Sequence, residues 1–128
     1  MKLLLDTHAL AWWFENSDRL GLQAEKAIAS SETVVMVSVV SAFEMTLKHR
    51  LGKWPGIEHL LLRFDDFLVH SGFDVLALSM EHAKLAGTMA IDHRDPFDRL
   101  LIAQARIEDA VLVSNEKLFD RFGVRRLW

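Results

Sequence analysis

Hydrophobic residues along the chain occur either in short unbroken runs or in longer stretches with helical spacing. The unbroken runs lie at 2–5, 33–38, 73–78 and 110–114, with a weaker one at 124–127. Such runs, rich in leucine and valine, are too short for stable helices and are typical of strands buried on both faces. They predict four strands and a candidate fifth.

The intervening stretches carry apolar residues three or four positions apart, which is the spacing of one helix face. Helices are expected at 8–15, 22–30, 41–52, 57–72, 79–90 and 96–109. Strands that alternate with helices indicate parallel pairing, because each connection must cross back over the sheet. The expected fold class is therefore α/β, a three-layer α/β/α sandwich with a central parallel β-sheet. A length of 128 residues fits a single domain, 1–128.

Composition narrows the class of protein. The chain is 51% hydrophobic and 26% charged, as is typical of a folded globular protein. Its longest apolar stretch, at 34–43, is too short to span a membrane, which takes roughly twenty residues. Asp6 and His8 interrupt the apolar N-terminal residues, so we expect no signal peptide. The absence of cysteine excludes disulfides and fits a cytoplasmic protein.

Net charge is −3, without the basic excess of proteins that coat long nucleic acids. A small basic cluster or a bound cation would still allow local contact with a nucleic acid.

Polar residues follow the predicted strands at the edge where a parallel sheet binds ligands. Ligands of such sheets gather beyond the carboxyl ends of the strands, so the residues that follow each strand are candidate site residues. If the strands are parallel, these side chains lie along one edge. Those that follow the strands are Asp6, Thr7, Glu44, Ser114, Asn115 and Glu116, and the helix start just before the fourth strand adds Asp95 and Asp98.

Each acid also has a purely structural interpretation. Ser41 and Glu44 have the spacing of a capping box. Asp95 stands before a proline, as a helix N-cap often does, and Asp98 lies in the first turn, where the helix dipole stabilises an anion. Asp6 could cap the helix that follows it.

The acids together indicate more than capping. Several carboxylates gathered at one edge repel each other and raise their own pKa values, so a compensating cation is needed. Nearby lysine or arginine side chains could supply it, and so could a divalent ion. Oxygen ligands without cysteine or a spaced histidine pair favour Mg²⁺ or Mn²⁺. Such an ion activates water and stabilises the charge that develops on a phosphate.

Four segments of the chain resemble a known family. They are LLLDTHALAWW, SAFEM, DHRDPFDRLLIAQA and LVSNEKLFDRFGV, in this order. Together they resemble the PIN-domain ribonucleases, and more closely the VapC-like toxins of type II toxin–antitoxin pairs. The resemblance covers essentially the whole chain. It implies a PIN-like fold, Mg²⁺- or Mn²⁺-dependent endoribonuclease activity on RNA, a homodimer, and inhibition by a cognate antitoxin protein.

The resemblance also implies roles for individual residues. Asp6, Glu44 and Asp98 match the acidic positions of the family, and Asp95 matches the first acid of its D-P-F-D variant, so these four are the expected metal ligands. The chain departs from the family after the fourth strand, where Ser114-Asn115-Glu116 replaces a frequent Thr-x-Asp. A second metal is therefore expected to bind weakly or not at all, and single-metal catalysis stays open.

Other polar residues receive supporting roles by the same resemblance. Asp98 or Glu116 would orient or deprotonate the attacking water. Arg94, Arg99 and Lys117 lie close in sequence to the acids and could contact flanking phosphates, but solvent exposure or pairing with the acids is the favoured interpretation. Side chains expected around the metal or the phosphate are Thr7, Ser114, Asn115 and Arg99.

Histidines and tryptophans near the predicted edge have structural interpretations. No histidine pair has the spacing of a transition-metal site, and His8 and His93 are expected at a helix start or on the surface. Trp12, Trp13 and Trp54 predict an apolar face suited to a dimer interface or to a groove for an amphipathic antitoxin helix.

Rival functions fit the sequence less well. A phosphatase of the haloacid dehalogenase type needs a second aspartate where this chain has His8, and a receiver domain needs paired acids after the first strand. The remaining alternative is a catalytically inactive PIN-like module that binds RNA or a protein partner. Asp6→Asn separates the two, because a nuclease would lose activity whereas a binding module would keep its partner.

Overall fold

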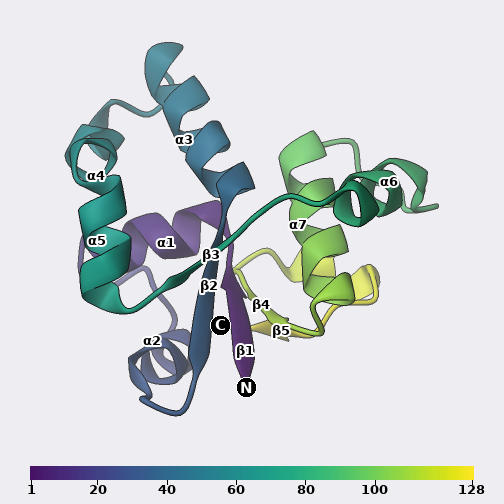
Figure 1. The fold of residues 1–128 in the computed structure, drawn as a ribbon, viewed down its shortest axis with the longest axis horizontal. Helices are drawn as coiled ribbons and strands as arrows, with labels where there is room; N and C mark the ends of the chain where they lie inside the picture. The colour runs from purple at the N-terminus through teal and green to yellow at the C-terminus, as the bar shows by residue number, and fades with distance from the viewer.

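The computed structural model describes residues 1–128 and contains one five-stranded sheet whose neighbouring strands are all parallel (Figure 1). The spatial order is β3-β2-β1-β4-β5. The strands are β1 (Lys2–Leu5), β2 (Val34–Ser38), β3 (Asp74–Leu76), β4 (Val111–Val113) and β5 (Arg126–Leu127). The predicted α/β class with a parallel sheet is confirmed, and each expected strand is present with ends shortened by at most two residues.

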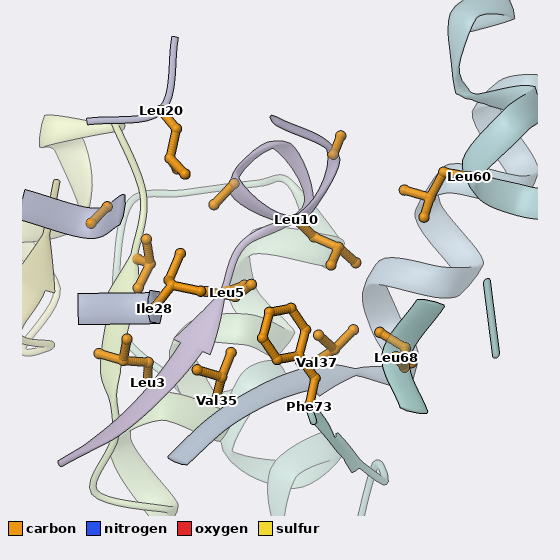
Figure 2. Close-up of a cluster of buried hydrophobic side chains, with 14 of the residues drawn as sticks. Leu3, Leu5, Leu10, Leu20, Ile28, Val35, Val37, Leu60, Leu68 and Phe73 are labelled. Carbon is orange, nitrogen blue, oxygen red and sulfur yellow. The ribbon is translucent and has the colours of Figure 1, made fainter. Parts of the chain in front are cut away.

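Alternate residues of each central strand enter different hydrophobic clusters. In β1, Leu3 and Leu5 pack on one face of the sheet and Leu4 packs on the other. The first cluster also contains Val35 and Val37 of β2, beside Leu10 and Phe73 (Figure 2). Both faces of the sheet are therefore covered, which explains why the strands read as unbroken apolar runs.

Helices form a layer on each side of the sheet (Figure 1). The first side carries α1 (Thr7–Phe14), α2 (Leu22–Ala29), α4 (Glu58–Leu62) and α5 (Phe64–Ser71). The second carries α6 (Met80–Thr88), α7 (Pro96–Ile107) and the short 3₁₀ helix η2 (Lys117–Arg121). Helix α3 (Val39–Arg50) extends beyond the end of β2 and packs against both α1 and α7, and the 3₁₀ helix η1 (Pro55–Ile57) leads into α4.

The single helix expected at 57–72 is wrong. The backbone leaves helical geometry at Arg63, with φ −124° and ψ 20°, so that α4 and α5 are separate helices. Helix α4 packs against α3, whereas α5 packs against β3, and one straight helix could not follow both. The predicted glycine stop is confirmed, because Gly72 ends α5 in the left-handed region at φ 71°.

The order of the strands opens a crevice at the carboxyl end of β1. The chain builds outward from β1 through β2 to β3 and then returns to place β4 on the other side of β1. Connections therefore leave β1 and β4 in opposite directions, and a parallel sheet binds its ligands at such a switch point. None of the helices has the length and apolar character needed to cross a membrane.

Candidate metal centre

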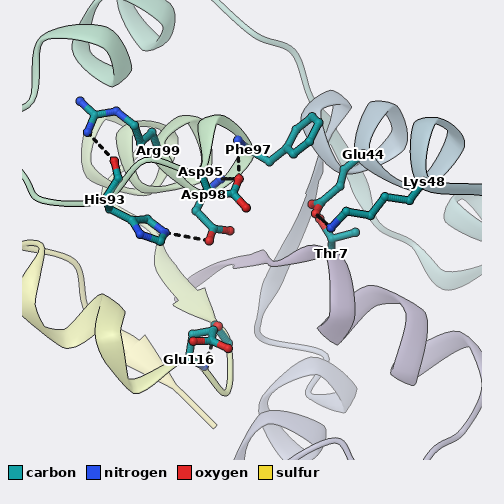
Figure 3. Close-up of polar contacts among 10 residues, drawn as sticks. Thr7, Glu44, Lys48, His93, Asp95, Phe97, Asp98, Arg99 and Glu116 are labelled. Carbon is teal, nitrogen blue, oxygen red and sulfur yellow. Dashed lines mark hydrogen bonds and ion pairs between the residues drawn. The ribbon is translucent and has the colours of Figure 1, made fainter. Parts of the chain in front are cut away.

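A polar pocket of about 130 Å³ lies beyond the carboxyl ends of β1 and β4, and no hydrophobic residue lines it. Five of its side chains are carboxylates, which come from the start of α1, from α3, from the first turn of α7 and from the loop after β4. Figure 3 labels Glu44, Asp95, Asp98 and Glu116 among them. The structure thus brings together the acids that the sequence placed along one edge. The lining residues are Asp6, Thr7, His8, Glu44, Lys48, Asp95, Asp98, Asn115 and Glu116.

Asp6 combines helix capping with a place in the pocket. It is the N-cap of α1, and its Oδ1 accepts a hydrogen bond of 2.8 Å from the N–H of Ala9. Burial raises the pKa of the Asp6 carboxyl to about 6, and the charges of Asp98 and Glu44 add to the increase. Hydrogen bonds from the Ser114 hydroxyl and from Ala9 oppose it. The predicted cap is therefore confirmed, on a carboxyl that holds its proton unusually tightly.

Glu44 lies inside α3, and the capping box expected for it is wrong. The helix begins at Val39, and the side chain of Ser38 is its N-cap, one turn before Ser41. Glu44 is 5% exposed, and its Oε1 accepts a hydrogen bond of 2.6 Å from the hydroxyl of Thr7. Its Oε2 lies 2.5 Å from Nζ of Lys48. Glu44 therefore serves no cap, and both of its oxygens have partners.

Asp95 and Asp98 hold different positions at the start of α7. Asp95 is the N-cap, and its Oδ1 accepts from the N–H groups of Phe97 and Asp98 at 2.9 and 3.2 Å, which confirms the predicted cap. Oδ2 of Asp98 lies 2.9 Å from Nε2 of His93. Burial raises the pKa of the Asp98 carboxyl, the hydrogen bond to His93 opposes this, and the charge of Asp95 adds to it. The His93 ring also stacks on Phe122, with 5.5 Å between ring centroids.

The loop after β4 contributes an exposed acid and an exposed amide. Ser114 is fully buried below the pocket, and its Oγ accepts a hydrogen bond of 3.0 Å from the N–H of Glu116. Asn115 and Glu116 are exposed and line the pocket. Glu116 precedes η2 but makes no side-chain cap, so its carboxylate is not committed to that helix.

Arg99 does not line the pocket, although the sequence made it a candidate to contact the phosphate. Its guanidinium donates hydrogen bonds to the backbone carbonyls of Ala86, Met89 and His93 at 2.8 to 2.9 Å, and to that of Ile91 at 3.3 Å. Figure 3 shows the bond to His93. A planar fork of five N–H groups suits this many acceptors. Arg99 therefore fixes the loop that leads to His93 and the pocket.

Residues 3–124 match the model of the PIN domain family. This chain belongs to the PIN-domain family. The resemblance noted in the sequence is thereby confirmed at the level of the family. A comparison with curated protein sequences gave no match.

The PIN domain shares its fold with chains in several known crystal structures. One is DNA-bound VapBC from Salmonella typhimurium, with TM-score 0.70, 18% identity, and coverage of 99% of this chain and 97% of that chain. Another is VapBC2 from Rickettsia felis, bound to a DNA fragment from its promoter. It has a TM-score of 0.67 and 18% identity, with coverage of 99% of this chain and 98% of that chain. FitAcB from Neisseria gonorrhoeae has a TM-score of 0.68 and 17% identity, with coverage of 98% of this chain and 96% of that chain.

The donors in the pocket of this PIN domain suit a hard divalent cation. Carboxylate and amide oxygens predominate, no thiolate is present, and several carboxylates share a small volume. Burial lowers the pKa of the His8 imidazole, which leaves Lys48 as the one positively charged side chain among the lining residues. The side chains are not preassembled as a coordination shell, since no three His, Asp or Glu residues are grouped in metal-binding geometry. A cation would therefore need some of these side chains to rearrange.

Lys48 and His93 contact acids of the site, but the sequence did not assign them to it. Lys48 follows Glu44 by one helical turn, and this i,i+4 spacing of opposite charges was a usable signal. His93 was expected at a helix start or on the surface, but it is partly buried and contacts Asp98. Its partner depends on how the loop before α7 folds back, which no local spacing reveals.

Proposed function

We propose that this PIN domain is a metal-dependent endoribonuclease that hydrolyses RNA phosphodiester bonds as the toxin of a type II toxin–antitoxin pair. The observation that carries the proposal is the pocket itself, in which five carboxylates from four separate segments meet at the switch point of the sheet. Membership of the PIN family supports the same activity.

Asp6, Glu44 and Asp98 would hold Mg²⁺ or Mn²⁺, with Asp95 beside them. Bound there, the cation would act as a Lewis acid that lowers the pKa of water and offsets charge on the phosphate. His93 holds the Asp98 carboxylate in one orientation through its bond of 2.9 Å. Glu116 is exposed at the edge of the pocket and is the candidate to accept a proton from the attacking water.

Supporting groups fix the geometry around these acids. The Thr7 hydroxyl orients Glu44, and it lies 3.1 Å from the hydroxyl of Ser41. The Ser114 hydroxyl donates a hydrogen bond to the Asp6 carboxyl, which stabilises its ionised form. Asn115 lines the pocket with a neutral amide that can donate to a phosphate oxygen.

We also propose a cognate antitoxin and a homodimer in the cytoplasm. A solved structure with this fold, from Klebsiella pneumoniae, is a toxin–antitoxin complex. Several large apolar side chains are exposed on this chain and suit protein partners. Those on α3, α4 and α5 are Val39, Phe43, Leu62 and Val69.

Purified protein, free of antitoxin, should cleave structured RNA in the presence of Mg²⁺ or Mn²⁺. The cleavage should stop when EDTA is added. Asp98→Asn should reduce the rate by on the order of 10²-fold or more, the scale on which loss of one group that stabilises transition-state charge acts. Asp74→Asn, an exposed change on β3, is the matched control and should cleave like wild type.

The rival interpretation is a PIN-like module that binds RNA or a partner without catalysis. If wild type and Asp98→Asn are equally inactive while both remain folded and bind RNA, this interpretation replaces the nuclease. The distinction needs a gel-based cleavage assay and a binding assay on the same RNA.

A further inference from the structure

We propose that the Lys48 ammonium occupies the place of the divalent cation at Glu44 and competes with it for that carboxylate. This inference rests on the proposed function, because it describes how the metal site is held while no metal is bound. It assigns to Lys48 the control of metal affinity rather than a contact with RNA.

The first support is the position of Lys48. It lies on α3 one turn beyond Glu44, in the orientation in which a glutamate and a following lysine pair most favourably. Its Nζ reaches Oε2 of Glu44 at 2.5 Å, and both residues line the acidic pocket (Figure 3). The ammonium therefore contacts one of the carboxylates that line the pocket.

The second support is the pattern of oxygen use. Asp95 accepts its backbone hydrogen bonds at one oxygen, and Asp98 contacts His93 through one oxygen. Glu44 has partners at both oxygens, Thr7 at Oε1 and Lys48 at Oε2. Thr7 is buried, with 3% of its surface exposed, whereas the Lys48 side chain is 33% exposed. Lys48 is therefore the partner that can leave.

The third support is the balance of charge. Five carboxylates line the pocket, and Glu44 is the most buried of them. A buried carboxylate without a counter-charge is strongly unfavourable, so the ammonium stabilises the empty pocket. A divalent ion has twice the charge and attracts several carboxylates at once, so it can displace the ammonium. The long lysine side chain can then move its charge into water while its methylene groups stay packed.

The test measures Mn²⁺ binding by isothermal titration calorimetry at one fixed pH, without RNA. Lys48→Met should bind Mn²⁺ about tenfold more tightly than wild type, within the usual range for two coupled binding events. Lys26→Met removes the same charge from an exposed position on α2 and should bind like wild type. Thermal unfolding should show a larger Mn²⁺-induced increase in Tm for Lys48→Met than for wild type.

A second variant covers the case in which Lys48→Met does not fold without metal. Lys48→Gln keeps a hydrogen-bond donor beside Glu44 but removes the charge, and it should also bind Mn²⁺ more tightly than wild type. Equal Mn²⁺ affinities in wild type and the folded Lys48 variants would overturn the inference. Slower RNA cleavage with unchanged Mn²⁺ affinity would also overturn it and would assign Lys48 to the RNA phosphate.

Failure of the proposed function is separate. If the Lys48 variants bind Mn²⁺ more tightly and yet neither they nor wild type cleave RNA, the competition stands and the nuclease does not. If neither wild type nor the Lys48 variants bind Mn²⁺, both proposals are overturned.

Discussion

At the scale of single residues, the acids of the pocket divide their oxygens between the fold and the site. Asp6 and Asp95 are helix caps, as the sequence predicted, because capping depends on local backbone that a short segment specifies. The capping box predicted at Ser41 and Glu44 was wrong, because Ser38, which is the N-cap in the structure, is equally compatible with a helix start. Lys48 and His93 were missed, since their importance depends on which acid each one meets in the folded chain.

The raised pKa of Asp6 predicts a stability cost at neutral pH. The carboxyl has a pKa of about 6 in the folded protein against 3.8 as its ordinary value, so the folded state binds the proton more tightly. Its favourable contribution is complete below pH 3.8 and is lost as pH rises through 6. At pH 8 the difference, about two pKa units, corresponds to about 3 kcal/mol.

Asp6→Asn should therefore be more stable than wild type at pH 8, with a free energy of unfolding that is higher by about 1–3 kcal/mol. The reason is that asparagine keeps a capping oxygen and does not titrate. The advantage should shrink as pH falls below 6 and vanish near pH 4. Urea unfolding of both proteins at several pH values, in EDTA, measures this. A variant no more stable than wild type at pH 8 would contradict the assigned pKa.

At the scale of elements, the alternation of strands and helices could be predicted from hydrophobic spacing. A strand buried on both faces is an unbroken apolar run, whereas a helix buried on one face has apolar residues three or four positions apart. The break between α4 and α5 did not follow from it. Leucine and phenylalanine continue at helical spacing through Arg63, and only packing against two different elements divides the helix. The conformation of the loop between α6 and α7 could not be predicted from hydrophobic spacing either, because Arg99 holds this loop through hydrogen bonds to its backbone carbonyls.

Arg99→Met should destabilise the protein by about 2–4 kcal/mol, because several carbonyls lose a charged donor at once. Arg99→Lys should recover little of this, since one ammonium cannot reproduce the planar fork. Arg94→Met, at an exposed position of the same loop, should change stability by less than about 0.5 kcal/mol. Urea unfolding measures all three, and hydrogen exchange should speed up selectively in the loop of Arg99→Met. Equal stability of Arg99→Met and Arg94→Met would contradict the role of the carbonyl contacts.

At the scale of the whole molecule, residues far apart in sequence close the structure around β1. The sequence predicted a parallel sheet and an acidic edge, but not the order of the strands, because similar apolar runs can exchange places. Trp128 packs against Trp12 at 5.6 Å between ring centroids and also covers Gly21. A Cβ at Gly21 would lie only 2.6 Å from the backbone carbon of Trp128.

Gly21→Ala should therefore displace Trp128 and lower the free energy of unfolding by about 1–3 kcal/mol, the usual cost of overpacking. Tryptophan fluorescence should shift toward that of solvent-exposed indole. Gly56→Ala is the matched control, because a Cβ there meets nothing within 4 Å. Identical fluorescence and stability in the two variants would show that Trp128 moves aside without loss.

The position of β1 at the centre of the sheet has a consequence for synthesis on the ribosome. A growing chain can pair β1 with β2 early, which brings Asp6 and Glu44 together. The other edge of β1 stays open until β4 emerges more than a hundred residues later, and Asp98 and Glu116 flank that strand in sequence. Domains fold as units once their long-range contacts are available. The pocket is therefore completed only after β4 and Glu116 have emerged, and a nascent chain that ends before them holds Asp6 and Glu44 without Glu116.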